Sequence, residues 1–562
     1  MPGSLDDFGI LRALIGFGPY EPRPTAPEWL ARFATMASSD RGVLALLGPG
    51  GISSTTEDDR RARAYFDAAA LYLAALANLL RGSSRSIAVG IPPGARHLPL
   101  LLAATAVLGR TVETALDQAP DRGSGVLVIS PDLDVRSRYC DLFVSSVQLD
   151  EAHPGSRLRR LGEKVPLNAR KPPAEADGVC FFLPPVSLPA KIDFRPALIL
   201  LDLRYAKWPR RTGDIVTWLR GVSRGAGLMC LYSLGDTDTE GTLRGSSFLD
   251  LPLDHAALET LAEGVRQATI PDQKLTVDWW LVASRSFLAR KHRIRAITDA
   301  NAIEKLFVDA GTLLDEHRKV SSPSLNRARW LQAVLTQVPV PLIWYEEAAR
   351  ALGRSTLRRL IDRLGTESRF DTDRGPVIQS MRMVFDLIYR QMEHGNKRAD
   401  TLKVLIVETA QRSGPDDGVL VLVRDRVVAR ALSNWLEIEV FRGAEWLPRV
   451  EVVDCSSYSD LATHRFRFGL VNGAFPRRYR WIAGASLADE ITFLTYDHEV
   501  RTVIGQLDQV YGETQVKDRA ARRRTAVSQL APAAKGKYGD TDAPNATLIL
   551  ELPPKRASLH GT

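Results

Sequence analysis

The stretch "SIAVGIPPGARHLPLLLAATAVLG", residues Ser86 to Gly109, decides the predicted fold of this chain. It begins as an apolar run typical of a β-strand, passes through a turn rich in Gly and Pro, and ends as an apolar helix. A second strand pattern, "GVLVISPDLD", follows at Gly125–Asp134. A strand, a helix and a further strand in this order predict a parallel sheet with crossover helices. The first turn also has the layout of a phosphate-binding loop.

The composition is typical of a soluble globular protein of several domains. The chain has 562 residues, of which 45% are hydrophobic and 25% charged, which excludes global disorder and a fibrous class. Its net charge of +8 favours an anionic partner. The 4 cysteines lie far apart, so we expect buried free thiols rather than a zinc site or disulfides. No apolar run has the length of a bilayer span, and we expect a cytoplasmic protein with no membrane partner.

The pattern along the chain predicts an α/β fold with two parallel-sheet domains separated by an all-α region. Strand patterns such as "ALILLDLR" and "GLMCLYS" are apolar without alternation, as in strands buried on both faces. The predicted parts are a mostly helical segment at 1–85, a first α/β domain at 86–250, an all-α domain at 251–400, a second α/β domain at 401–530 and a loose tail at 531–562.

The first turn matches the phosphate-loop pattern GxxxxGK[ST] only in part. Gly90 takes the first glycine, Ala95 the second, Arg96 the lysine and His97 the hydroxyl residue. Two prolines remove backbone N–H donors, and His is a poor Mg²⁺ ligand, although Arg96 could still meet a phosphate. The favoured interpretation is an inherited turn without a ligand. If nucleotide is bound, the candidate contacts are Gly90, Gly94, Arg96, His97 and Asp202.

The strand "ALILLDLR" carries the second candidate residue. In phosphate-loop motors such a strand ends in Asp-Glu, where Asp holds the metal and Glu helps to activate water. Asp202 stands at the first place, but Leu203 stands at the second. Hydrolysis would therefore lack its base. An Asp at this place also serves ordinary turn chemistry.

The order of the motifs, from about Ile87 to Glu499, resembles the core of a superfamily 1 or 2 helicase, which has two RecA-like domains. "GIPPGARH", "VLVISPDLDVRSRY", "LILLDLR" and "GLMCLYSLGDTD" stand where the motifs of the first domain would be. "GVLVLVRDRVVARALSNWL" is similar to the opening of the second domain, and the resemblance implies that Arg424 faces the nucleotide. The departures fall on the hydrolytic residues, which favours a fold without a working motor.

"FPRRYRW" followed by "TFLTYDHE" is similar to the DrmE proteins of DISARM-type anti-phage systems. This resemblance implies a bacterial defence component that acts on or near DNA beside other subunits. Helicase-like subunits of repair complexes that have lost their motor are the alternative.

Two basic clusters with aromatic residues are candidates for contact with single-stranded or forked DNA. Guanidinium groups neutralise phosphates while Tyr or Trp stacks on bases, and both clusters follow apolar strands. The alternative is a solvated face whose aromatics finish packing a loop. The candidates are Arg204, Lys207, Trp208, Arg210, Arg211, Arg477, Arg478, Tyr479, Arg480 and Trp481.

Three further segments are assigned mainly structural roles. "FLARKHRIRAI" (Phe287–Ile297) and "KDRAARRR" (Lys517–Arg524) are predicted to be helices with solvated charged faces, and phosphate contact is the alternative for each. The sequence around Gly353 has helix-turn-helix spacing, which two helices packed in a bundle explain equally well.

Three functions are weighed. The first is a non-hydrolysing, helicase-like subunit that binds nucleic acid in a multi-protein complex, with no cofactor expected. The second is a divergent ATPase that uses Arg96, Asp202 on Mg²⁺ and Arg424 as an arginine finger. The third is a protein-binding scaffold without DNA contact.

Overall fold

The structure is a computed structural model in which the chain forms two compact units. Unit 1 takes in the described residues of Met1–Ala289, Gly484–Ser486 and Asp508–Thr547, and unit 2 those of Arg290–Ala483, Leu487–Leu507 and Leu548–Thr562. The residues that the structure describes are 57–80, 83–97, 100–101, 104, 126–131, 180–183, 196–203, 212–223, 225–266, 285–288, 291–298, 300–320, 322–371, 373–414, 417–442, 449–457, 466–485 and 487–530.

The sheet of unit 1 is parallel throughout its described strands. The strand order is β3-β2-β4-β5-β1-β6, so that β5 separates β1, which enters the first turn, from β4, which ends in Asp202. All residues of β2, β4 and β5 are buried, which confirms the prediction of strands covered on both faces. The strands are β1 (Ser86–Ile91), β2 (Val126–Ile129), β3 (Cys180–Leu183), β4 (Leu198–Asp202), β5 (Gly227–Ser233) and β6 (Leu249–Pro252).

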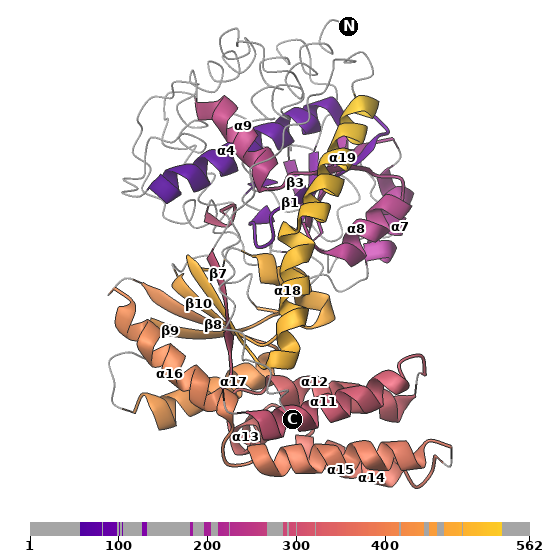
Figure 1. The fold of residues 1–562 in the computed structure, drawn as a ribbon. Coiled ribbons are helices and arrows are strands. Elements are labelled where there is room, and N and C mark those ends of the chain that lie inside the picture. Colours follow the sequence, from indigo (N-terminus) through magenta and orange to yellow (C-terminus); the bar gives the residue numbers. More distant parts are fainter. Residues whose placement is uncertain are drawn as a thin grey trace, which may run out of the picture. The chain divides into compact units, whose positions relative to one another are not determined.

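Helices cover this sheet (Figure 1). Helix α7 (Thr212–Ser223) buries Ile215, Val216 and Leu219 against strand residues of the same core. Helix α4 (Glu57–Leu80) packs on α9 (His255–Arg266) and on β5. A Cβ at Gly227 would lie 2.2 Å from the carbonyl oxygen of Leu80, so the end of α4 approaches β5 as closely as it does only because residue 227 is glycine.

Unit 2 contains the second parallel sheet, with the described order β7-β11-β10-β8-β9. Two parallel sheets with their helices form an α/β architecture consistent with two RecA-like domains, as predicted. Two described cysteines, Cys230 and Cys455, are buried free thiols, which was also predicted. The strands of unit 2 are β7 (Lys291–Ala296), β8 (Gly418–Val423), β9 (Val450–Asp454), β10 (Phe466–Asn472) and β11 (Glu490–Thr495).

Strand β7 corrects the prediction that "FLARKHRIRAI" is helical. It lies within residues 251–400, which were predicted to be all-helical, and pairs in parallel with β11. His292 and Ile294 are buried while their neighbours are partly or fully exposed. This alternation has the period of an edge strand whose outward residues are mostly charged. The prediction was wrong because a run dense in basic residues is also typical of the charged face of a helix.

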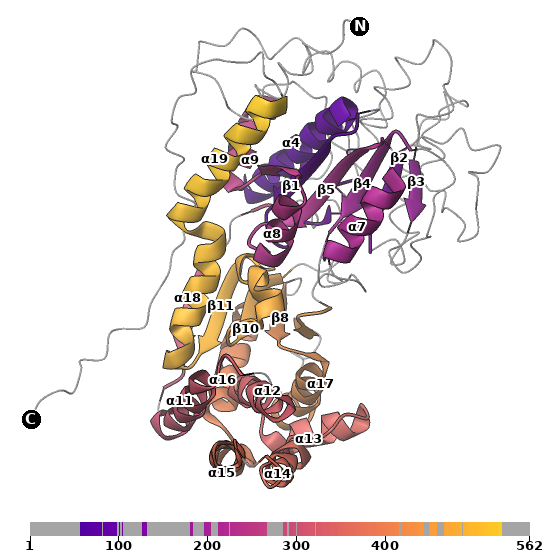
Figure 2. The same cartoon turned by 90° about the vertical axis from the view of Figure 1, so that its right-hand side faces the viewer.

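The helices between the two sheets share the core of the second sheet. Their buried residues, including Phe385 and Leu402, belong to one cluster with Val421 of β8 and Leu470 of β10. Figure 2 views two of these helices, α14 and α15, along their axes. The helices are α11 (Asn301–Glu316), α12 (Pro323–Gln337), α13 (Leu342–Ala351), α14 (Leu357–Glu367), α15 (Gly375–Met392) and α16 (Lys397–Arg412).

The pair of helices around Gly353 packs as part of this bundle. Helix α14 packs on α15 and α12, whereas α13 packs on α17 (Arg426–Trp435). Gly353 has a φ of +64° and ends the tight turn that leads to α14. The bundle interpretation of this segment is therefore confirmed.

Two helices complete the described chain, α18 (Asp497–Tyr511) and α19 (Glu513–Leu530). The sequence places α19 at the end of the second α/β domain, but it packs on β6 in unit 1. Its basic run "KDRAARRR" was predicted to face solvent. Instead, the Arg519 side chain is buried, Arg522 pairs with Asp250 and Glu240, and Arg523 pairs with Asp254. Acidic residues of unit 1 compensate the charges of Arg522 and Arg523, whereas Arg519 donates to the Gln509 and Val510 carbonyls.

Candidate nucleotide site and nucleic-acid interface

The carboxyl ends of β1, β2 and β4 meet at one edge of the first sheet. Ile91 pairs with Ser233 of β5, and Asp202 pairs with Leu231 of the same strand. On the other side of β4, Ile129 pairs with Leu201, so Ser130 follows at the level of Asp202. This is the edge at which open α/β sheets bind ligands.

A fully buried cluster of three polar residues occupies this edge. The Nδ1 atom of His97 lies 2.6 Å from Oδ1 of Asp202, and the Ser130 hydroxyl donates to Oδ2 of Asp202 over 2.8 Å. All three side chains are inaccessible to solvent. Asp202 and His97 were both predicted as nucleotide contacts. The structure brings them together, but their side chains contact each other. Ser130 was not among the predicted residues.

The cluster engages both oxygens of the carboxylate that a metal would need. Mg²⁺ is bound through carboxylate oxygens and keeps several waters. For Mg²⁺ to reach Asp202, the hydrogen bond from Ser130 or the contact with His97 would have to be broken in a place closed to water. Leu203, at the position expected for a catalytic glutamate, is 1% exposed and packs in the core. The arrangement has the chemistry of a structural hydrogen-bonded cluster rather than of a metal site.

Two backbone N–H groups of the loop already donate hydrogen bonds within the protein. The Ala95 N–H donates to the Pro92 carbonyl over 3.1 Å, and the Arg96 N–H donates to the Ser286 hydroxyl over 3.3 Å. Pro92 and Pro93 have no N–H to offer. Gly94 has a φ of +79°, so glycine there serves the turn.

Gly90 also has a packing role. A Cβ at this position would lie 2.5 Å from Leu234 Cδ2 and 2.7 Å from the Tyr232 hydroxyl. The close approach of β5 side chains therefore explains the glycine without a phosphate.

Sequence reasoning did not foresee the segment that supplies Ser286. Residues 285–288 lie 190 positions after the loop, and Phe287 stacks edge-on with Phe66 of α4 at 5.8 Å between ring centroids. Phe287 is fully buried, so the segment is anchored in the core. No local pattern around Arg285 indicates this contact with the loop.

The "GD" element follows β5 and caps a helix. Asp236 accepts hydrogen bonds from the Thr239 N–H (3.2 Å) and hydroxyl (2.8 Å) at the start of α8 (Thr237–Gly245). The pKa of Asp236 is raised to about 6, mainly because the carboxylate is buried; the hydrogen bonds from Thr239 act to lower it, and the charges of Asp238 and Glu240 add to the rise. At neutral pH this carboxylate is ionised and held by its capping role.

Arg424, the predicted arginine finger, lies at the end of β8 in unit 2. Its side chain is 14% exposed, and its Nε lies 3.6 Å from Asp425 Oδ2. Burial lowers its pKa, while the charge of Asp425 and the proximity of Tyr345 and Cys455 act in the opposite direction. The guanidinium is thus enclosed by residues of its own unit.

The two basic clusters differ in what the structure shows of them. Residues 204–211, with Arg204, Lys207, Trp208, Arg210 and Arg211, lie outside the described residues. The second cluster forms a 3₁₀ helix, Arg477–Gly484. Arg478 is exposed and its guanidinium lies 5.4 Å from the centre of the Tyr479 ring, which is partly exposed, as is Arg480.

Trp481 is the member of this cluster for which the structure corrects the prediction. Its side chain is 1% exposed, in a buried run with Ile482 and Ala483. An indole enclosed in this way has no free face for a base, so we assign it to the core. The basic residues before Trp481 suggest an exposed position, but the apolar residues after it are buried and Trp481 is buried with them.

A buried polar network at the carboxyl edge of the second sheet was also not predicted. The Arg398 guanidinium, fully buried, donates to Asn472 Oδ1 (3.2 Å) and to the Leu494 carbonyl (2.9 Å), pairs with Glu499 and lies 4.4 Å from the Tyr496 ring centroid. Gly473, with a φ of +78°, makes room for it. The network ties α16 and α18 to strands β10 and β11.

Comparison with known proteins finds matches among solved structures alone. No family model matches the sequence, and no curated protein matches it. The structure matches the crystal structure of the Pyrococcus furiosus Hef helicase domain with a TM-score of 0.35 and 13% identity, covering 76% of this chain and 96% of that chain. A likeness at this level does not establish a shared function.

Within the described residues, no helix has the length and apolar character needed to cross a bilayer. The same part of the chain contains no group of three or more His, Cys, Asp or Glu side chains arranged to hold a metal ion.

Proposed function

We propose that this chain is a helicase-like protein that binds nucleic acid and does not hydrolyse ATP. The observation that carries the proposal is the buried contact of His97 and Ser130 with both oxygens of Asp202. In a phosphate-loop motor that carboxylate is available to Mg²⁺, which bridges the outer phosphates and neutralises the charge of the transition state.

The surrounding residues support the same conclusion. Leu203 supplies no base. In the loop, the Ala95 N–H donates to the Pro92 carbonyl and the Arg96 N–H donates to the Ser286 hydroxyl. A phosphate cradle depends on several free N–H groups aimed at one point. In this loop the N–H groups of Ala95 and Arg96 are engaged elsewhere, and Pro92 and Pro93 have none.

The nucleic-acid part of the proposal rests on charge and on the second basic cluster. The net charge of +8 attracts a polyanion, and Arg478 with Tyr479 presents a guanidinium beside an aromatic ring at the protein surface. Sequence-tolerant binding to single strands is built from such pairs. The proposal extends to membership of a multi-protein complex, including an anti-phage defence complex of the kind that the sequence resemblance implies.

The test is calorimetric titration of the full chain with ATP and Mg²⁺, with and without a single-stranded oligonucleotide. We expect no saturable heat that depends on Arg96 in either condition and no release of phosphate above the buffer rate. Saturable ATP binding that is lost in Arg96→Ala, together with phosphate release that is lost in Asp202→Ala, would favour the divergent ATPase instead. Partner capture after nuclease treatment, with no affinity for oligonucleotides, would favour the scaffold.

A further inference from the structure

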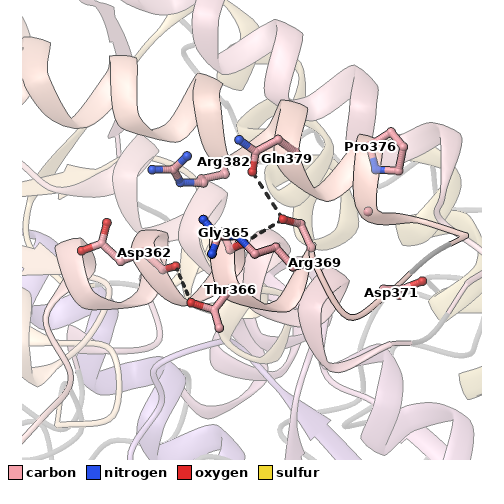
Figure 3. A pocket seen from close by; sticks show the side chains of 10 residues that line it. Asp362, Gly365, Thr366, Arg369, Asp371, Pro376, Gln379 and Arg382 are labelled. Carbon is pink, nitrogen blue, oxygen red and sulfur yellow. Dashed lines mark hydrogen bonds between the residues drawn. The ribbon is translucent and has the colours of Figure 1, made fainter.

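A pocket of about 580 Å³ lies between α14 and α15 in the helical region of unit 2. Its walls come from the last turns of α14, the connection after it and the first two turns of α15 (Figure 3). Most of the lining side chains are polar, and the lining residues are Asp362, Gly365, Thr366, Ser368, Arg369, Asp371, Gly375, Pro376, Gln379 and Arg382. None of these residues belongs to the edge of the first sheet or to the second basic cluster.

The acidic side chains of the pocket are already engaged. Asp362 lies 3.6 Å from Arg358 Nε, on the same helix. Asp371 Oδ1 accepts the Arg374 N–H over 3.0 Å. The nearby Glu367 pairs with Arg327 and Arg363.

The two arginines of the pocket have no such partner. Neither Arg369 nor Arg382 forms an ion pair with any residue that the structure describes, and Arg382 Nε is a buried donor without an acceptor there. Figure 3 shows both side chains beside Gly365. Two guanidinium groups brought to one pocket repel each other, and a buried N–H without an acceptor is costly.

Two glycines produce this geometry. A Cβ at Gly365 would lie 2.8 Å from both Cδ and Nε of Arg382, so the absence of a side chain lets Arg382 lie across α14. A Cβ at Gly375 would lie 2.4 Å from the Ser368 carbonyl oxygen, so glycine also lets the start of α15 approach the end of α14. The start of an 18-residue helix carries partial positive charge.

We infer that this pocket binds a phosphate group. Two guanidinium forks and the positive end of α15 match a dianion, and the planar fork of arginine fits phosphate oxygens in pairs. The phosphate belongs either to a small free ligand or to the backbone of a nucleic acid. The inference does not depend on the fate of ATP at the first sheet.

The probes are inorganic pyrophosphate, titrated by calorimetry, and a fluorescent single-stranded oligonucleotide, followed by anisotropy. Arg382→Gln and Arg369→Gln each remove one fork, and we expect each to weaken pyrophosphate binding about tenfold or more. Arg359→Gln is the matched control, because Arg359 is an exposed arginine of α14 that does not line the pocket. It should leave pyrophosphate binding unchanged.

Gly365→Ala is a variant in which a loss of pyrophosphate binding can be distinguished from a loss of stability. The added methyl displaces Arg382, whereas alanine in a helix interior is favoured over glycine, so pyrophosphate affinity should fall without loss of thermal stability. If Arg382→Gln also weakens the oligonucleotide complex more than Arg359→Gln does, the phosphate is that of nucleic acid. If only pyrophosphate binding falls, it is that of a free ligand. The inference is overturned if wild-type protein binds no pyrophosphate and the Arg382→Gln and Arg359→Gln variants bind the oligonucleotide equally.

Discussion

His97 Nδ1 lies 2.6 Å from Asp202 Oδ1, and neither side chain is exposed to solvent. The two residues come from the phosphate-loop-like turn after β1 and from strand β4, on the far side of β5, which are the elements that hold nucleotide and metal in motor proteins. Here they hold each other. Removing one partner of a buried pair leaves an uncompensated group in the core, and this gives the first prediction.

His97→Ala should lower the free energy of unfolding of unit 1 by about 3–5 kcal/mol, because the buried Asp202 carboxylate loses its contact with the imidazole. Ser130→Ala removes the weaker contact and should cost about 1–3 kcal/mol. Urea unfolding at pH 7 measures both. A loss below about 1 kcal/mol in His97→Ala would mean that Asp202 is not held in this way.

Asp236→Asn should change how stability depends on pH. The folded pKa of Asp236 is raised to about 6, so the folded protein keeps a proton that the unfolded chain has released, and stability falls as pH rises from about 4 to about 6. Asn cannot ionise and is an equally good cap. The variant should therefore gain stability relative to wild type across this range, up to about 3 kcal/mol at pH 7.

Urea unfolding of both proteins at pH 4, 5, 6 and 7 makes this measurement. His255, whose pKa burial lowers to about 4, acts with the opposite sign: its neutral form stabilises the fold at neutral pH, and this is lost as pH falls from about 6.5 to 4. Because His255 is present in both proteins, it cancels in the difference. A difference that does not grow with pH would contradict the raised pKa.

The sequence predicts the elements whose signal is local. Strand β4 is recognised from "LILLD" because every residue of a strand covered on both faces is apolar until its polar end. From there the meeting of His97 and Asp202 at one sheet edge follows, since carboxyl ends of parallel strands share an edge. Their direct contact does not follow, because the same residues could face a ligand.

What the sequence does not predict depends on residues far away along the chain. The sequence predicts an exposed Arg522, because no residue near it in the sequence indicates that it pairs with Asp250, 272 positions earlier. Ser286 reaches the loop across 190 positions, and Arg398 meets Glu499 across 101. Local periodicity also fails for β7, where His292 and Ile294 alternate with basic residues in a strand too short to show its period clearly.

Arg522→Met should destabilise unit 1 by about 3 kcal/mol. The side chain is 13% exposed and pairs with Asp250 and Glu240, which are themselves almost enclosed, so its loss leaves buried carboxylates without a counterion. Lys517→Met is the control on the same helix, because Lys517 and its partner Glu513 are both 72% exposed, and it should change stability by less than about 0.5 kcal/mol. Equal effects of the two variants would contradict the buried position of α19.

The last prediction concerns the surface pair Arg478 and Tyr479. If this pair contacts single-stranded nucleic acid, Arg478→Ala removes one phosphate contact, and the slope of log affinity against log salt should become shallower by about 0.7. Tyr479→Leu keeps the charge and removes the ring, so it should weaken binding by about 1–3 kcal/mol while leaving the slope unchanged. Anisotropy titrations of an oligonucleotide at several salt concentrations separate the two effects. Because Trp481 is buried, Trp481→Leu should act through stability, visible in unfolding, and a loss of affinity in a fully folded Trp481→Leu protein would return the indole to the binding surface.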